Sequence, residues 1–281
     1  MEKLGLTAIR NDGLRFNYQN GDWGLIELEG LDFAPIDINS VPRGFGNGDI
    51  VVGKRKASRD IKVVARLQNG ENYQKLRSQV IGFHNSNYKF DLLINYLGDI
   101  KIAKNCELKV AGYPTGNIWK NQNLSLMFFC PDSDLLAEKS DIVGFTTVKP
   151  LWGVPRGYTS TQKLAFGEIA KATEKTVNYL GSENAPITAT IRASGLVQGV
   201  DLTINLLTSH ISTTLVGGDT LVIDTEKRVV TKNTVPVPLT EYDANSLLEM
   251  VLVYGDNTVK IESTSNAFNA DIDFIGRYGG I

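Results

Sequence analysis

The sequence predicts a mainly β protein, with an N-terminal β-barrel or β-sandwich that carries one covering α-helix, followed by a C-terminal β-sandwich. Apolar and polar residues alternate through most of the chain, as they do in strands that bury one face. Turn-forming residues recur at short spacing, which is typical of sandwiches and barrels. One segment in the first half instead repeats its apolar residues every three or four positions, which indicates a helix.

The alternation is clearest in residues 61–66, 187–192 and 202–206. Turn signals lie between segments of this kind, at Asn11-Asp12-Gly13, Asn20-Gly21-Asp22, Gly217-Gly218-Asp219 and Gly255-Asp256-Asn257. We therefore expect sequential antiparallel sheet in both halves.

The expected helix covers about residues 71–84. Its apolar stripe consists of Tyr73, Leu76, Val80 and Phe83, which are separated by polar residues. A helix of this length is marginal by itself, so its stripe must lie on a sheet.

Length and charge both indicate two domains. A chain of 281 residues is long for a single β module. Residues 1–131 hold 17 basic and 13 acidic side chains and residues 132–281 hold 12 and 18, so the halves carry +4 and −6. Because the apolar segment 124–129 runs into the turn-forming residues 130–134, we expect domains 1–135 and 136–281.

Composition excludes several functional classes. A net charge of −2 is a poor balance for a dedicated nucleic-acid binder. Two cysteines and two histidines are too few for a zinc cluster, a haem site or a disulfide scaffold, so we expect no metal and no cofactor. Cys106 and Cys130 are expected to be buried free thiols. The sequence shows no signal peptide and no stretch of about 20 apolar residues, so we expect synthesis in a cytosol and no membrane insertion.

Candidates for catalysis are few. His84 and His210 have no supporting motif and are expected to be surface or turn residues. Asp271 and Asp273 lie on one face of a predicted strand, about 6–7 Å apart, which is close to a glycosidase carboxylate spacing. The simpler interpretation is that they form the solvated face of that strand, and a glycoside hydrolase is the weakest functional alternative.

The glycine-rich segment 43–49 does not fit a phosphate-binding loop. Gly44, Gly46 and Gly48 have the spacing G-x-G-x-G, and an extended segment follows them rather than a helix. They are expected to form a sharp turn or a flexible finger.

Six cations follow within thirteen residues, against the single acid Asp60. They are Lys54, Arg55, Lys56, Arg59, Lys62 and Arg66. This basic strip has two interpretations, a solvated strand edge or a surface that meets acidic partners such as a neighbouring protomer or a polyanion.

Four stretches of turns and alternating strands follow one another along the chain. None of them identifies a family alone, but their order and spacing together are fairly specific. The first is the glycine-rich turn and basic strand from Gly44 to Val63, and the second is the helix and strand region from Tyr73 to Asp132. The third is Val177–Ile187. The fourth comprises Gly218–Asp224 with Arg228–Val230, then Leu252–Val259, then Ala270–Phe274 with Tyr278.

Together these stretches resemble the distal tail protein of long-tailed, siphophage-type bacteriophages, the siphovirus tail component family, over nearly the whole chain. The sequence departs from the family at Ser133-Asp134-Leu135-Leu136, where members are aromatic-rich, and at Gly255-Asp256-Asn257 in the last hairpin. These departures affect local turn geometry.

The resemblance implies a non-enzymatic virion structural protein of the tail tip or baseplate. Its N-terminal domain would form a hexameric ring, able to stack back to back, around a channel through which DNA passes. Its C-terminal domain would be a galectin-like β-sandwich. The partners implied are the tail-tube protein, a tail-associated fibre or lysin hub and receptor-binding proteins that serve host attachment. Assembly would take place in the bacterial cytoplasm.

Within that ring, we expect the glycine turn and the start of the basic strip to lie at the channel or between protomers. The residues concerned are Gly44, Gly46, Gly48, Lys54, Arg55, Lys56 and Arg59. The alternative function is a carbohydrate-binding module for a cell-wall glycan, in which Trp152 or Tyr158 would contact the sugar.

Overall fold

The computed structural model describes residues 4–68, 73–113, 123–150, 167–171, 173–265 and 267–281. The chain forms two compact units: Met1–Glu138 with Arg277–Ile281, and Lys139–Gly276. The first crossing between them lies close to the boundary expected at residue 135. The last five residues differ from the expectation, because they return to the first unit.

The first unit is an antiparallel sheet with strand order β2-β1-β7-β8-β9-β6-β3. Its strands are β1 (Leu4–Arg10), β2 (Arg15–Asn17), β3 (Trp23–Glu29), β6 (Arg59–Leu67), β7 (Lys89–Tyr96), β8 (Asp99–Gly112) and β9 (Asn123–Cys130). The alternation expected at 61–66 is confirmed in β6, because Ile61, Val63 and Ala65 are fully buried.

Helix α1 (Tyr73–Phe83) covers this sheet, as the apolar stripe predicted. Leu76, Val80 and Phe83 are buried in the same core cluster as residues of β1, β6, β7 and β9. The cluster also contains Tyr18 and Trp23, so the first unit has a core of its own.

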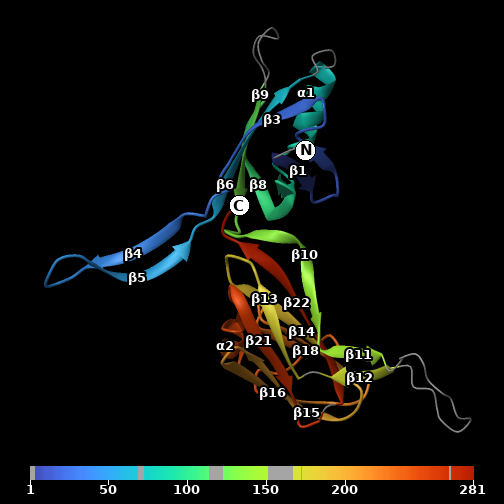
Figure 1. Cartoon of the computed structure of the whole chain (residues 1–281). Helices are drawn as coiled ribbons and strands as arrows, with labels where there is room; N and C mark the ends of the chain where they lie inside the picture. Colours follow the sequence, from blue (N-terminus) through green and yellow to red (C-terminus); the bar gives the residue numbers. More distant parts are fainter. Residues whose placement is uncertain (1–3, 69–72, 114–122, 151–166, 172, 266) are drawn as a thin grey trace, which may run out of the picture. The chain divides into compact units, whose positions relative to one another are not determined.

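The second unit is a two-sheet sandwich, as expected (Figure 1). One sheet has the order β13-β21-β15-β16, and the other β19-β18-β17-β14-β22, with β20 paired to β14. The strands are β13 (Glu174–Tyr179), β14 (Ala185–Ala193), β15 (Val197–Ile204), β16 (Leu207–Leu215), β17 (Thr220–Asp224), β18 (Val229–Lys232), β19 (Val235–Pro236), β20 (Val251–Leu252), β21 (Gly255–Glu262) and β22 (Phe268–Tyr278). Apolar residues of both sheets form one buried cluster.

Two further features complete the second unit. The short helix α2 (Ala244–Leu248) is capped by Asp243, whose side chain accepts a hydrogen bond from the Asn245 amide. Strands β11 (Thr146–Pro150) and β12 (Gly167–Lys171) pair as a separate two-stranded ribbon.

Strands β10 (Leu135–Gly144) and β22 contain the two points at which the chain passes between units. In the first unit, Leu136 and Ala137 of β10 pair with β8. In the part of the chain that the structure describes, no helix is long and apolar enough to cross a membrane.

Candidate functional site

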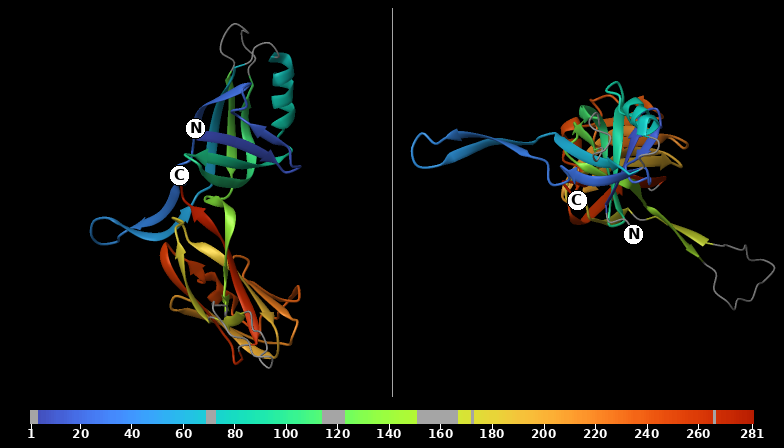
Figure 2. Two further views of the ribbon diagram at one scale, coloured as in Figure 1. Left: turned by 45° about the vertical axis from the view of Figure 1, so that its right-hand side comes forward. Right: turned by 90° about the horizontal axis from the view of Figure 1, so that it is seen from above.

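The glycine turn and the start of the basic strip belong to a two-stranded hairpin of the first unit, formed by β4 (Ile36–Pro42) and β5 (Asp49–Lys56). We call residues 36–56 the arm. Within the described residues, its two strands pair with each other and with no other strand. Figure 2 shows that the arm projects away from the rest of its unit.

The strand residues explain why the segment is extended. Strand β4 contains the β-branched residues Ile36, Ile38 and Val41, and β5 contains a run of β-branched residues at 50–52. The register joins Ile36 to Lys56 and Pro42 to Asp49, with a bulge at Val52, which has no partner opposite.

The tip of the arm is a closed turn between two strands, and no helix follows it, as the glycine-rich segment predicted. The Arg43 amide donates to the Gly48 carbonyl at 3.2 Å. Gly46 and Gly48 have φ values of 101° and 94°, which favour glycine strongly, whereas Gly44 has no positive φ. Phe45, between them, is fully exposed.

Almost the whole arm is exposed to solvent. All seven residues of β4 are exposed, and so are all residues of β5 except Lys56. The exposed large apolar side chains are Ile36, Ile38, Val41, Phe45, Ile50, Val51 and Val52. Because an isolated two-stranded hairpin is marginally stable in water, a surface of this kind indicates a binding partner.

Both faces of the arm carry apolar side chains. Cross-strand partners share a face, so Ile36 and Ile38 lie with Lys56 and Lys54 on one side. Val41 pairs with Ile50 on the other side, nearer the tip. A partner that covers one face alone would leave the other apolar set in water.

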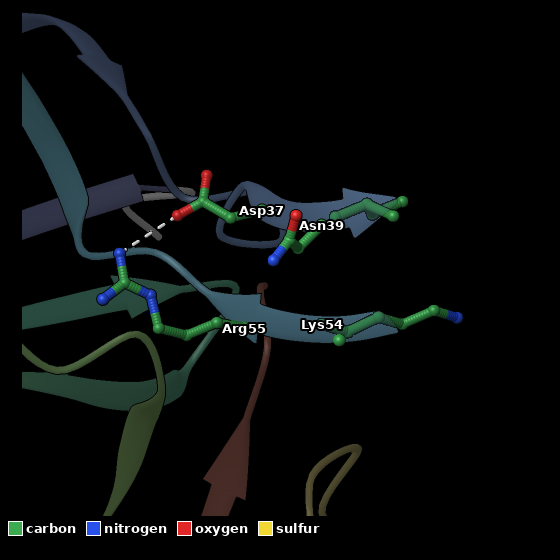
Figure 3. A pocket seen from close by; sticks show the side chains of 6 residues that line it. Asp37, Asn39, Lys54 and Arg55 are labelled. Atoms are coloured by element: carbon green, nitrogen blue, oxygen red, sulfur yellow. Dashed lines mark hydrogen bonds and ion pairs between the residues drawn. The ribbon is translucent and has the colours of Figure 1, made fainter. Parts of the chain in front are cut away.

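The charges near the base of the arm differ in their surroundings. On one face, Arg55 Nη2 lies 3.2 Å from Asp37 Oδ2 and both side chains are exposed. Lys54 forms no ion pair with any described residue, and Figure 3 shows it directed away from the Asp37–Arg55 pair. Gly53, opposite Asn39, leaves an open depression between these side chains (Figure 3).

The root of the arm is tied to the first unit. The Ala57 amide donates to the Pro35 carbonyl at 2.8 Å, which brings the two ends of the arm together. Lys56 Nζ lies 3.1 Å from Asp134 Oδ1, where both side chains are partly buried. The charge of Lys56 is therefore directed toward its own unit.

Arg59 differs from the expectation that it contributes to an exposed interface. Its side chain is 2% exposed, and its guanidinium donates to the carbonyls of Ser133, Gly30 and Gly279. Burial lowers the pKa of Arg59, although three backbone carbonyls satisfy its donors. Arg59 anchors the structure below the arm and presents no charge to a partner.

The last two cations of the basic strip differ, because Lys62 is ion-paired within the first unit, whereas Arg66 is exposed and donates to the side-chain oxygen of Asn123 at 3.5 Å. Lys62 Nζ lies 3.3 Å from Glu27 and 3.0 Å from Glu29 on the adjacent strand β3. Those carboxylates raise the pKa of Lys62. Of the six cations, Lys54 and Arg55 are the two exposed ones on the arm.

Strand β4, the other strand of the arm, was not predicted from the sequence. Its signal was the apolar set Ile36, Ile38 and Val41 before a glycine turn, mirrored by residues 50–52 after it. Two apolar segments joined by a glycine-rich turn indicate a hairpin.

His84 differs from its expected place at the surface, because it lies in the core of the first unit. Its Nδ1 is 3.0 Å from the Val80 carbonyl, which can only accept, so Nδ1 carries the proton. Nε2 then accepts from the Tyr18 hydroxyl at 2.6 Å. Burial lowers the pKa of His84 to about 4. His84 is a structural residue with both ring nitrogens satisfied.

The other candidates for chemistry are paired or buried. His210 is exposed, as expected, and its Nδ1 lies 2.5 Å from Asp201 Oδ1. Asp271 pairs with Arg192 across the sheet, which holds its carboxylate in an ion pair. Asp273 has one buried oxygen without a described partner. Among the described residues, no three His, Cys, Asp or Glu side chains gather in a way that could hold a metal ion.

Cys106 and Cys130 are fully buried free cysteines, as expected. They lie next to each other, since Glu107 of β8 pairs with Phe129 of β9 and the thiols interact directly. The pKa of the Cys106 thiol is raised by its hydrogen bond with Cys130 and by burial. Trp152 and Tyr158, the glycan-contact candidates, lie outside the described residues.

No family model and no curated protein matches the sequence. The crystal structure of the SPP1 Dit protein, called a paradigm of the hub adsorption apparatus in phages that infect Gram-positive bacteria, does match. Its TM-score is 0.64 at 11% identity, and the match covers 97% of this chain and 98% of that chain. Two structures of the phage P2 baseplate in its activated conformation, with Ca and with Sr, match at a TM-score of 0.43 and 11% and 10% identity, covering 99% of both chains.

The chain therefore has the fold of the SPP1 Dit distal tail protein along nearly its whole length. The mainly β fold with a helix-bearing first unit and a sandwich after it, expected from the sequence, is confirmed.

Proposed function

We propose that the chain is a structural protein of the bacteriophage tail tip, which assembles through its first unit into a ring. The ring, hexameric as the family resemblance implies, joins the tail tube to the fibre or lysin hub and leaves a channel for DNA. The shared fold with the SPP1 Dit protein supports the tail-tip role.

The observation that carries the proposal is the arm. It is an exposed hairpin with apolar residues on both faces, paired only with itself among the described residues. A ring repeats one heterologous interface, in which a projection on each copy meets a different surface of the next. Burying the arm between copies removes its apolar side chains from water and stabilises the hairpin.

The assembled particle would lie at the virion tail tip after synthesis in the bacterial host. Its partners would be the tail-tube protein, the fibre or lysin hub and receptor-binding proteins, and DNA would only pass through the ring. The proposed role is structural and includes no catalytic activity.

The test removes the arm without disturbing the first unit. Ile36 and Lys56 face each other, so an Asn-Gly turn can replace residues 37–55 and close the hairpin at its base. We expect the full chain to form rings in light scattering and electron micrographs, and the shortened variant to stay monomeric with an unchanged circular dichroism spectrum. Rings of normal size from the shortened variant contradict the role of the arm. A full chain that stays monomeric at every concentration contradicts the ring itself.

A further inference from the structure

The two cysteines of the chain meet in the core of the first unit, on neighbouring strands. Cys106 lies in β8, and Cys130 is the last residue of β9. The register of these antiparallel strands pairs Glu107 with Phe129, so the next pair along is Cys106 with Cys130. Cross-strand partners share one face of a sheet, and here both side chains lie on the buried face.

This placement fits the geometry of a disulfide. Directly opposed residues of an antiparallel pair have Cα atoms about 4.5 or 5.5 Å apart, depending on the hydrogen-bonding pattern. A disulfide requires a Cα separation of about 4.4–6.8 Å, so both arrangements are suitable. The two thiols already interact directly. A bond between the sulfurs therefore needs rotation of side chains and no movement of a strand.

A buried cation lies beside the two sulfurs. Arg59 of β6 pairs with Cys130 along the other edge of β9, and its guanidinium interacts electrostatically with both cysteines. A neighbouring cation stabilises the thiolate, which is the form of cysteine that attacks an oxidant. The hydrogen bond with Cys130 and burial act in the opposite direction, because they raise the pKa of the Cys106 thiol. The pair is therefore stable as a dithiol while the sheet is closed.

Access to the pair depends on the end of β9. Both cysteines are 0% exposed, so an oxidant reaches them only when the sheet opens locally. Pro131 follows Cys130 and has no amide hydrogen with which to continue the strand pairing. The pair thus lies at a strand end, where local opening costs less than in the middle of a sheet.

We propose that Cys106 and Cys130 form a modification site, at which a peroxide or a similar small two-electron oxidant converts the dithiol into a disulfide between β8 and β9. A reducing cytosol keeps the pair as a dithiol. A tail-tip protein leaves that compartment with the virion and then meets oxidants. This setting rests on the proposed function, whereas the chemistry of the pair does not.

With hydrogen peroxide the reaction balances in two steps. One sulfur attacks the O–O bond and takes one oxygen as a sulfenic acid, while its thiol proton leaves with the other oxygen as water. The second sulfur attacks the sulfenic sulfur, the S–S bond forms, and hydroxide departs with the second thiol proton as another water. The two thiols lose two electrons and two protons, and one peroxide becomes two waters.

The disulfide would stabilise the part of the first unit on which the arm is built. It closes a loop of about 24 residues, which restricts the unfolded chain. Strand β9 lies between β8 and β6, and β6 begins at Arg59 beside the arm root. We expect the thermal midpoint of the first unit to rise by about 5–10 °C on oxidation.

Peptide mapping of the full chain tests the site directly. The chain is purified with a reductant, transferred to hydrogen peroxide under folding conditions, and then denatured in iodoacetamide and digested. We expect a peptide that joins Cys106 to Cys130, in chains that run as monomers on a non-reducing denaturing gel, and no alkylated cysteine. Dithiothreitol should restore two alkylated cysteines. Because the chain has two cysteines, a disulfide within a monomer can only be this one.

Thermal unfolding measures the consequence of the bond. The midpoint of the natural chain should rise after oxidation and return with dithiothreitol. Cys106→Ala and Cys130→Ala each keep one thiol, so their midpoints should not rise after the same treatment. Each variant is compared with itself before oxidation, which removes the cost of the cavity that the substitution leaves. If neither variant folds, the peptide map of the natural chain still decides.

The outcomes separate this inference from the proposed function. Two alkylated cysteines after peroxide treatment contradict the site, and so does a sulfinic acid on either cysteine or a disulfide found only between chains. A disulfide that leaves the midpoint unchanged contradicts the stabilising role. Rings that form from a chain unable to make the disulfide leave the proposed function standing. A chain that makes the disulfide but stays monomeric at every concentration contradicts the ring alone.

Discussion

Arg59 Nη2 donates a hydrogen bond of 2.6 Å to the carbonyl of Gly279, which lies 220 positions later in the chain. The same guanidinium binds the Ser133 carbonyl, just before β10 leaves the first unit. One buried cation therefore joins the arm root to both segments that connect the two units. The arm is anchored on the side of the first unit where the chain leaves and returns.

Replacing Arg59 should destabilise the first unit strongly. Arg59→Met keeps much of the side-chain volume but leaves the carbonyls of Ser133, Gly30 and Gly279 without their donor, so we expect a loss of about 3 kcal/mol in unfolding free energy. Denaturant unfolding measures this loss. Arg55→Met, in an exposed ion pair, is the matched control and should change stability by less than about 0.5 kcal/mol. Equal effects of the two variants would show that the buried network contributes little.

The buried His84 predicts a specific dependence of stability on pH. Its pKa is about 4 in the folded chain and near the ordinary 6.5 in the unfolded chain, so the unfolded state binds a proton first. The contribution of His84 to stability is fully present above pH 6.5 and falls by about 3 kcal/mol as the pH drops to about 4.

The measurement is the unfolding free energy between pH 4 and 7 for the natural chain and for His84→Gln. The difference between the two should shrink as the pH falls, because glutamine does not titrate. His210→Gln, at the exposed histidine, should keep the pH dependence of the natural chain. Parallel curves for the natural chain and His84→Gln contradict the assignment.

Much of the fold could be predicted because a helix or strand that buries one face repeats its apolar residues at its own structural period. The stripe of Leu76, Val80 and Phe83 predicted α1, and the alternation in 187–192 predicted β14, both of which the structure contains. The return of residues 277–281 could not be predicted, because it depends on Arg59 and Gly279, two residues far apart in sequence.

The candidate site could be predicted in part for a related reason. Charge type is visible in a sequence, but burial of a charge is not, so Lys54 and Arg59 look alike there while one is exposed and the other buried. His84 was misplaced for the same reason, since Tyr18, its hydrogen-bond partner, lies 66 positions away.

Reversing the two exposed cations of the arm should separate assembly from folding. Lys54→Glu with Arg55→Glu changes residues that are exposed to solvent, so we expect the thermal midpoint of the monomer to shift by less than about 2 °C. Ring formation should be impaired, because the proposed ring needs the arm to meet a neighbouring copy and the reversed charges alter the surface that the arm presents. Normal rings on electron micrographs would show that these charges form an ordinary solvated edge.

The last prediction concerns the two units as separate folding bodies. The buried core of the second unit lies entirely within residues 139–276, so that fragment should fold alone with one cooperative transition.

Residues 1–138 alone should be less stable than the same residues joined to 277–281 by a short Gly-Ser linker. Without the last five residues, Arg59 loses the Gly279 carbonyl, and Lys101 loses the Tyr278 ring, which lies 3.2 Å from its ammonium group. Lys101 is 6% exposed, so the loss leaves a buried charge with Asp99 as its remaining partner among the described residues. We expect the linked form to exceed the truncated form by about 3 kcal/mol in denaturant unfolding. Equal stability of the two forms would mean that the C-terminal return is incidental to the first unit.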